Sequence, residues 1–403
     1  MPAPAHNGNG EGMMACTDGG GDGPAEPYLL TPGPLTTSAR TKRAMLRDWG
    51  SRDGDFIALV ADIRRRLVAM AGGGDDTDCV LMQGSGTFAV EAALASFVPR
   101  DGRVLVPING AYGRRIATIL DYLGRGRVVL DTGDWLPPRP DQVDAVLARD
   151  PAVTHVALVH CETTSGVVNP LAGIAEVVRR RGRRLIVDSM SAFGALPLNV
   201  RQAPIEALVS SANKCIEGVP GFAFVIAGKA ALAACEGNSH SLSLDLFDQW
   251  TAMTRNGQWR FTPPTHVLAA FHEALLQHAE EGGAVGRQAR YARNRDVLVA
   301  GMRAMGFETL LPDTCQGPII VTFLCPADPA FRMDRFYDEI KARGYVIYPG
   351  KLTAAETFRI GCIGRLDETV MHGVLDAVRE AIAVMGVTSC RPVTAQPSKG
   401  ERR

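Results

Sequence analysis

Lys214 stands in the stretch "SSANKCIEGVPGF" (residues 210–222), where small hydroxyl and amide side chains are followed by an apolar, glycine-broken run. The nearest carboxylate after it is Glu217. Lysine is rarely buried unless it is paired. A lysine that loses its charge in such a setting can act as a nucleophile or a base. The stretch therefore indicates a catalytic amine, with an ordinary surface lysine as the alternative.

Asp188 ends the strongly apolar stretch "LIVD" (185–188), which has the composition of a buried strand. A carboxylate there needs a cation or hydrogen-bond donors as partners. The segment from Asp188 to Lys214 has room for one loop, one short helix and one strand. We therefore expect the two side chains to meet at one edge of a sheet, where open α/β folds bind their ligands.

Polar residues also follow other apolar stretches. Ser85, Gly86 and Thr87 open a helix directly after "DCVLMQ", and backbone N–H groups at a helix N-terminus attract phosphate. The alternative is an ordinary helix start. Tyr112, in "NGAYGRR", could stack on a planar ring, and the alternative is a turn aromatic.

The stretch "HCETTSG" offers the hydroxyl groups of Thr163 and Thr164, whereas His160 and Glu162 are favoured as structural residues. A phosphate-binding turn, a stacking aromatic ring, an aspartate at a strand end and a late lysine are together the parts of a pyridoxal phosphate site. There the aspartate keeps the ring nitrogen protonated, and the lysine forms the Schiff base and acts as the base.

The elements that must position these residues follow a regular pattern. From residue 78 short apolar stretches alternate with helical ones, which predicts a mainly parallel α/β sheet. From about residue 283 a long amphipathic helix precedes short strands and helices, which predicts a smaller α+β domain. The expected division is a disordered N-terminal extension (1–27), an arm and large cofactor-binding domain (28–282), a small C-terminal domain (283–388) and a flexible tail (389–403).

The 403-residue chain carries 43 Lys and Arg and 43 Asp and Glu, so its formal net charge is zero. Balanced charge provides no general attraction for nucleic acid or a membrane, and the cluster "RRRGRR" (179–184) is expected to be a solvated helix end. The nine cysteines form no CxxC pair and no metal-like cluster, which favours a reducing compartment and no metal site. Without a signal-peptide pattern or a membrane-length apolar run, we expect a cytoplasmic protein.

Longer motifs resemble those of the class V aminotransferases from about residue 28 to residue 387. They are "LLTPGPLTTS", "QGSGTFAVEA", "NGAYGRR", "HCETTSGVVNP", "VDSMSAFG", "SSANKCIEGVPGFAFVIA", "RFTPPTH" and "FRIGCIGRL". The resemblance implies a pyridoxal 5′-phosphate-dependent transferase of fold type I, which is a homodimer with active sites at the subunit interface.

Carried over by motif, the resemblance assigns Lys214 to the Schiff base and Asp188 to the ring nitrogen, with Tyr112 stacked on the ring. Thr163 would contact the ring hydroxyl, and Arg359 would bind the keto-acid carboxylate through its fork-shaped guanidinium. The phosphate would be held by Ser85, Gly86, Thr87, Asn213 and the partner subunit's Thr262.

The implied reaction moves the amino group of 2-aminoethylphosphonate to pyruvate, giving phosphonoacetaldehyde and L-alanine in phosphonate catabolism. The alternative is a class V aminotransferase of the alanine– or serine–glyoxylate type. A desulfurase would need a cysteine on a mobile loop, whereas Cys362 stands in a strand-like stretch. A catalytically silent cofactor-binding protein is disfavoured because Asp188 and Lys214 are both present.

Overall fold

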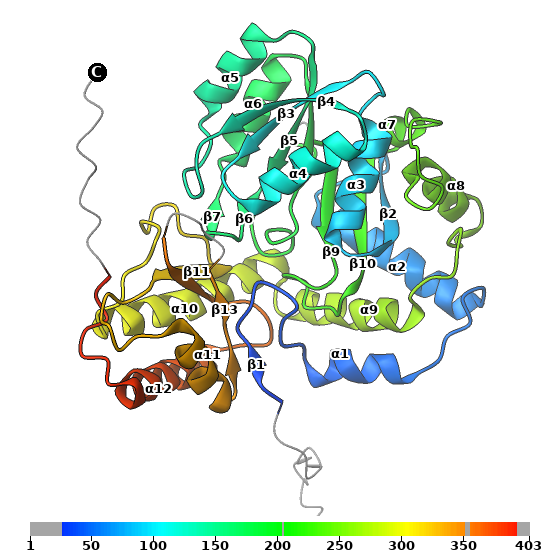
Figure 1. Ribbon diagram of the computed structural model, residues 1–403. Helices are drawn as coiled ribbons and strands as arrows, with labels where there is room; N and C mark the ends of the chain where they lie inside the picture. Colours follow the sequence, from blue (N-terminus) through cyan, green and yellow to red (C-terminus); the bar gives the residue numbers. More distant parts are fainter. Residues whose placement is uncertain (1–25, 204, 351–354, 393–403) are drawn as a thin grey trace, which may run out of the picture.

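The computed structural model describes residues 26–203, 205–350 and 355–392. A large part is built on a seven-stranded sheet, and a smaller part is built on a three-stranded sheet (Figure 1). The expected extension at 1–27 and tail at 389–403 lie mostly outside the described residues. The domain boundaries remain predictions, and helix α10 begins at Gly283, next to the expected division.

The central sheet has the strand order β2-β10-β9-β8-β5-β3-β4, and β10 is the strand that runs antiparallel to its neighbours. Most of its strands are buried and apolar on both faces because helices cover both faces. This arrangement confirms the predicted α/β fold with a mainly parallel sheet. The strands are β2 (Thr77–Gly84), β3 (Arg103–Ile108), β4 (Gly126–Asp131), β5 (Val153–Val159), β8 (Arg184–Asp188), β9 (Ile205–Ser211) and β10 (Gly221–Gly228).

Two layers of helices enclose this sheet, and each layer contributes to a separate apolar core. On one face lie α2 (Gly54–Met70), α5 (Pro140–Arg149), α6 (Leu171–Arg180) and α9 (Thr265–Glu280). On the other face lie α3 (Gly86–Phe97), α4 (Ala111–Tyr122), α7 (Lys229–Ala233) and α8 (Leu246–Asn256). The short hairpin β6 (Cys161–Glu162) and β7 (Val167–Val168) follows β5.

The short helix for which the segment between Asp188 and β9 has room is not formed in its described residues, where the chain makes turns instead. Gly194 adopts a left-handed φ of +88°, and Pro197 follows it. Both residue types interrupt helices. The next strand, β9, nevertheless returns beside β8, so the segment still ends next to Asp188.

The smaller part packs three helices around its own sheet and has its own apolar core. Its sheet has the order β11-β14-β13, and both of its strand pairs are antiparallel. The strands are β11 (Ile320–Leu324), β13 (Tyr348–Pro349) and β14 (Thr357–Gly361), and the helices are α10 (Gly283–Ala304), α11 (Met333–Ala342) and α12 (Glu368–Met385).

An N-terminal arm connects the two parts. Strand β1 (Tyr28–Leu29) pairs in parallel with β12 (Tyr345–Val346) of the smaller part. The chain then passes the functional site and forms α1 (Ala39–Arg43) and a 3-10 helix (Ala44–Leu46), which pack on α9 of the large part. The arm is therefore anchored in both parts.

Helix α10 presents an unusual buried stripe. Its buried residues follow helical spacing, but the first three of them are polar, and only the last two are apolar. The stripe consists of Arg287, Tyr291, Asn294, Leu298 and Met302. The predicted long helix is thus present, but it is not amphipathic, because arginine and asparagine occupy part of its buried face.

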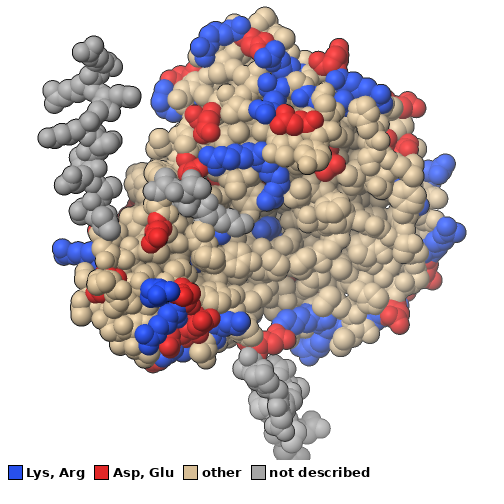
Figure 2. All heavy atoms as spheres, viewed as in Figure 1, with Lys and Arg blue, Asp and Glu red and all other residues tan. Residues whose placement is uncertain are grey.

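Acidic and basic side chains are interspersed over the rim of the face seen in Figure 2, and a broad surface at its lower right carries few of them. The arginine cluster at 179–184 forms ion pairs, as expected of a solvated helix end. Its pairs are Arg179 with Glu176, Arg180 and Arg181 with Asp144, and Arg184 with Glu206. Among the described helices, none combines the length and the apolar character needed to cross a bilayer.

Candidate active site

Lys214 and Asp188 lie at neighbouring strand ends. Asp188 is the last residue of β8, and Lys214 comes shortly after β9, which pairs with β8 in the central sheet. Both side chains line a cavity of about 200 Å³. Seven of the predicted site residues line this cavity: Ser85, Gly86, Thr87, Tyr112, Asp188, Asn213 and Lys214.

The arm covers the lysine. Lys214 Nζ donates a hydrogen bond to the carbonyl oxygen of Pro32 at 2.7 Å. The arm approaches so closely that a Cβ atom on Gly33 would lie 2.6 Å from the Asn213 carbonyl oxygen and 2.7 Å from Lys214 Cδ. Gly33 also has a left-handed φ of +112°, so glycine is required here for both conformation and space.

Asp188 is buried, with 7% of its surface exposed. Its Oδ1 accepts a hydrogen bond from the backbone N–H of Met190 at 3.0 Å. Burial raises the pKa of this carboxyl to about 6, although the nearby Lys214 and Arg115 charges favour its ionised form. A protonated ring nitrogen beside Asp188 would supply the hydrogen-bond donor and the positive charge that a buried carboxylate needs.

The N-terminus of α3 forms one wall of the cavity. Ser85 is the N-cap, and its side chain makes no capping hydrogen bond, so it does not satisfy the first N–H groups of the helix. A Cβ atom on Gly86 would lie 2.6 Å from Met190 Sδ, which explains the glycine. Exposed N–H groups at a helix N-terminus suit a phosphate group.

Tyr112 lines the cavity from the first turn of α4. Its backbone N–H donates to Glu162 Oε2 at 3.1 Å, and Thr164 Oγ1 donates to Glu162 Oε1 at 2.5 Å. Burial raises the pKa of Glu162. His160 Nδ1 lies 3.1 Å from Ser189 Oγ, and burial lowers the pKa of His160 to about 4. The contacts of Glu162 and His160 therefore agree with the structural role favoured for these two residues.

Thr163 and Arg359 meet beside the cavity, although neither lines it directly. The buried Thr163 Oγ1 has no hydrogen-bond partner among the described residues, which leaves it available to a ring hydroxyl. Arg359, which is 1% exposed, donates from Nη1 to the Thr163 carbonyl oxygen at 2.8 Å and from Nη2 to that of Pro349 at 3.2 Å. Burial lowers the pKa of its guanidinium, and within the described chain it forms no salt bridge.

Thr262 is not brought to this cavity. It is exposed in the loop before α9, and its carbonyl oxygen accepts a hydrogen bond from Gln83 Nε2. Cys362, the cysteine weighed for a desulfurase, is fully buried at the end of β14, and its carbonyl oxygen accepts from Asn294. A contact of Thr262 with a partner subunit remains a prediction.

The sequence interpretation missed Arg115, which lines the cavity. Its Nη1 donates to Thr87 Oγ1 at 3.2 Å, and its guanidinium lies 4.9 Å from the centre of the Tyr112 ring. The available signal was spacing, because residues three apart on a helix share a face. Arg115 therefore adds positive charge next to the proposed phosphate position.

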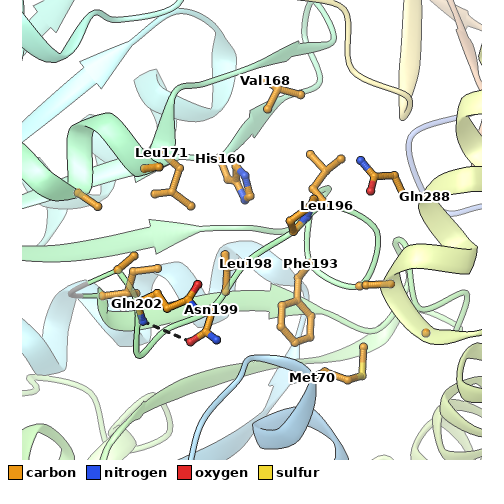
Figure 3. Close-up of a pocket in the computed structure, with 18 of the residues that line it drawn as sticks. Met70, His160, Val168, Leu171, Phe193, Leu196, Leu198, Asn199, Gln202 and Gln288 are labelled. Carbon is orange, nitrogen blue, oxygen red and sulfur yellow. Dashed lines mark hydrogen bonds between the residues drawn. The ribbon is translucent and has the colours of Figure 1, made fainter.

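A larger cavity, of about 1180 Å³, lies on the opposite face of the sheet between α2, α6 and α9 (Figure 3). Apolar side chains such as Phe193, Leu196 and Leu198 line it together with Asn199 and Gln202. Neither Lys214 nor Asp188 reaches it. Size alone therefore does not identify the reactive site, and the chemistry lies in the smaller cavity.

Comparisons with known proteins agree with this geometry. The family model described as Aminotransferase class-V matches residues 39–328. The chain is 62% identical over 370 residues to the 2-aminoethylphosphonate–pyruvate transaminase of Rhizobium meliloti (strain 1021), covering 91% of this chain and 96% of that one. It is 59% identical over 371 residues to 2-aminoethylphosphonate–pyruvate transaminase 1 of Paraburkholderia xenovorans (strain LB400), covering 92% and 95%.

A solved structure shares the fold. The pyridoxamine–pyruvate aminotransferase of Mesorhizobium loti superposes with a TM-score of 0.83 at 24% identity, covering 90% of this chain and 94% of that chain. At that identity the likeness concerns the fold alone. It agrees with the predicted transferase fold type I.

Proposed function

The chain belongs to the class V aminotransferase family, and from this premise we propose that it moves the amino group of 2-aminoethylphosphonate to pyruvate, giving phosphonoacetaldehyde and L-alanine. The observation that carries the proposal is the 62% identity, over 91% of the chain, to a transaminase named for these two substrates. The same name recurs among further relatives at 59% and 55% identity. This shared name favours the proposed reaction over that of the glyoxylate-using alternative.

The proposed cofactor is pyridoxal 5′-phosphate. Three features support it: the buried Asp188 carboxylate, the unpartnered Thr163 hydroxyl and the open N-terminus of α3. They suit a ring nitrogen, a ring hydroxyl and a phosphate group respectively. When bound, pyridoxal phosphate supplies an aromatic ring that withdraws electrons from the carbon bearing the amino group.

Lys214, Asp188 and the N-terminal arm have separate roles in this reaction. Lys214 takes the proton from the amino-bearing carbon of the aminophosphonate and, in the second half-reaction, delivers a proton to the keto carbon of pyruvate. Its amine can give up a proton, whereas the Arg115 guanidinium in the same cavity stays protonated. Asp188 holds the proton on the ring nitrogen, since its buried carboxylate stabilises a positive charge there. The arm over Lys214, held by the Pro32 carbonyl contact, limits the access of water to the amine.

Two different anions must use this pocket in turn. The planar carboxylate of pyruvate suits Arg359, whose fork of N–H donors matches it. Burying an arginine without a counter-ion is costly, so a bound carboxylate would compensate for that burial. The tetrahedral phosphonate suits the hydroxyl and backbone N–H groups of the arm "TPGPLTTS". Arg359 therefore binds mainly the carboxylate of the keto acid.

We also propose a homodimer in which the partner subunit's Thr262 contacts the phosphate. Phe88, Leu242 and Phe261 are large apolar side chains exposed by 50%, 73% and 48%. Arg260 joins two of them, because its guanidinium lies 5.0 Å from the Phe261 ring centre and donates to the Leu242 carbonyl oxygen. Exposed apolar groups that lie close together mark interaction sites.

Mixed dimers test this arrangement. Lys214→Ala and Thr262→Asp should each be inactive alone, the second because its carboxylate would repel the phosphate. A mixture of the two proteins, unfolded and refolded together, should regain activity, since one site of each mixed dimer has both native residues. A mixture without activity, or a protein that sediments as a monomer, contradicts a shared site.

The described cysteines support a reducing compartment such as the cytoplasm. All eight of them are unpaired, and disulfides are typical of oxidising compartments.

Single-turnover absorbance tests the reaction itself. The purified protein loaded with pyridoxal phosphate should lose its visible band when 2-aminoethylphosphonate is added and regain it with pyruvate. Alanine or serine with glyoxylate is the comparison pair. A protein that responds to that pair and ignores 2-aminoethylphosphonate belongs to the glyoxylate-using alternative.

A further inference from the structure

Glu217 ends the turn that begins at Lys214, and its backbone N–H donates to the Lys214 carbonyl oxygen at 2.8 Å. Its φ is +65°, and it is the one non-glycine residue with positive φ in the described chain. Such a conformation costs free energy for any residue with a Cβ. Glycine or asparagine would adopt it more easily, so the reason for glutamate lies in its carboxylate.

That carboxylate is buried against α10. Glu217 Oε1 accepts from the Tyr291 hydroxyl at 2.6 Å and from Arg290 Nη2 at 2.7 Å, and Arg287 Nη1 lies 3.3 Å away. The same Arg287 nitrogen donates to the carbonyl oxygen of Cys215, the residue after Lys214, at 2.5 Å. Helix α10 therefore holds the lysine turn through both a side chain and the backbone.

The same face of α10 also binds the segment after β14. Arg290 Nη1 donates to the carbonyl oxygens of Gly364 and Leu366 at 2.5 and 2.9 Å. Asn294 Nδ2 donates to those of Cys362 and Leu366, both at 3.1 Å. This segment continues the strand that carries Arg359. One helix face thus joins the lysine turn to the strand of the substrate-binding arginine.

The network is charge-balanced. Glu281 pairs with Arg287 at 2.7 Å and with Arg290 at 2.8 Å, so two carboxylates face two guanidinium groups. Buried ion pairs are poor sources of stability, because apolar residues of similar size often stabilise a fold as well. Removing one member, however, leaves an uncompensated charge beside the turn. A role in placing the lysine explains this cluster better than a role in stability.

We propose that Glu217 is a positioning residue for Lys214: with Arg287, Arg290 and Tyr291 it sets the turn so that the amine reaches the cofactor aldehyde. The inference deepens the proposed function and rests on Lys214 being the amine that captures the cofactor. Glu217 itself touches neither cofactor nor substrate.

Two cofactor forms test this. Pyridoxal 5′-phosphate must react with Lys214, whereas pyridoxamine 5′-phosphate binds the same pocket without reacting. In cofactor-free Glu217→Gln, formation of the visible adduct should slow by about tenfold or more, the size of a typical coupling within such a network. The dissociation constant for pyridoxamine 5′-phosphate should stay within about twofold, since the phosphate contacts are unchanged.

Arg64→Gln is the matched control. Arg64 pairs with Asp78 at 2.8 Å in a similarly shielded site on α2 and β2, and neither residue lines the site cavity. Its loss should lower the melting temperature as much as Glu217→Gln does and leave adduct formation unchanged. Glu217→Asp, which keeps the charge with a shorter reach, should recover part of the rate.

Three outcomes would overturn the inference: an unchanged adduct rate in Glu217→Gln, an equal loss of pyridoxamine phosphate binding, or the same slowing in Arg64→Gln. Neither measurement uses a substrate. A wild-type protein that forms the adduct and ignores 2-aminoethylphosphonate would contradict the proposed reaction alone and leave Glu217 in its role.

Discussion

Lys214 Nζ donates to the carbonyl oxygen of Pro32 at 2.7 Å, although the two residues are 182 positions apart in the sequence. The amine is thus held at the strand ends of the sheet by a backbone atom of the N-terminal arm. An ammonium group has three rotatable N–H donors, and this contact fixes the direction of one of them.

Borohydride reduction tests the assignment of Lys214. Reduction of the protein loaded with pyridoxal phosphate should fix the label on the peptide that contains Lys214. Lys214→Ala should still bind pyridoxamine phosphate and lose turnover by at least about a hundredfold, because it lacks the general base. A label on another lysine contradicts the assignment.

Gly33→Ala tests the fit of the arm. The added Cβ would meet Asn213 and Lys214 at less than 3 Å and would need a left-handed φ. Turnover should fall by about tenfold or more, since the clash and the strain together exceed about 1–3 kcal/mol. Gly133→Ala is the control, because Gly133 has a φ of +90° with nothing within 4 Å of its Cβ position. Equal losses in the two variants would leave strain alone as the cause.

Asp188→Asn tests the partner of the ring nitrogen. The variant should bind pyridoxal phosphate and lose turnover by at least about a hundredfold, the scale of a missing electrostatic contact in an active site. The reason is that a neutral amide does not hold a proton on the ring nitrogen. Near-normal turnover, measured by alanine formation from pyruvate, would show that another carboxylate has this role.

The raised pKa of Asp188 predicts a pH dependence of stability in the cofactor-free protein. Its folded pKa of about 6 exceeds the ordinary value of 3.8, so between these values the folded state holds a proton that the unfolded state has lost. The free energy of unfolding should therefore fall as pH rises from about 4 to 6, by up to about 3 kcal/mol. In Asp188→Asn this component should be absent from urea unfolding curves measured across that range.

Arg359→Lys should separate the two half-reactions. Lysine keeps the charge and loses the fork that matches a carboxylate. The pyruvate half-reaction should slow by about ten- to a hundredfold, corresponding to a charge-assisted contact of about 1.5–3 kcal/mol. The aminophosphonate half-reaction should change less.

Single-turnover spectra with each substrate measure both rates. Arg303→Lys, in an exposed pair with Asp313, is the control and should change neither. Equal losses in both half-reactions would mean that Arg359 binds both anions.

Residues at strand ends could be predicted from the sequence, because an apolar run followed by a polar residue marks the end of a buried strand. Asp188 and Tyr112 are examples, and both line the cavity. Strand β4 cannot be recognised in this way, because it is an edge strand with alternating exposure and charged residues such as Arg127. It does not have the continuous apolar character of its neighbours.

The polar stripe of α10 could not be predicted for a different reason. Some partners of Arg287 and Arg290 lie more than seventy positions away in the sequence, as in the contacts to Cys215 and Gly364. Other partners lie across a turn. Sequence periodicity reports which face of a helix is buried and carries no information on distant partners. Arginine and asparagine at those positions therefore resemble exposed residues until the fold is known.

The parallel pairing of β1 with β12 has a consequence for the order of folding. Tyr28 and Leu29 leave the ribosome long before the strand they pair with, which exists only after Tyr345 and Val346 have been made. Until then the arm has only its anchor on α9, and the lysine turn cannot be joined to the segment near Gly364. A contact of such long range is closed late. The large domain can collapse earlier, during synthesis, but the active site should be completed only after Tyr345 and Gly364 have been made.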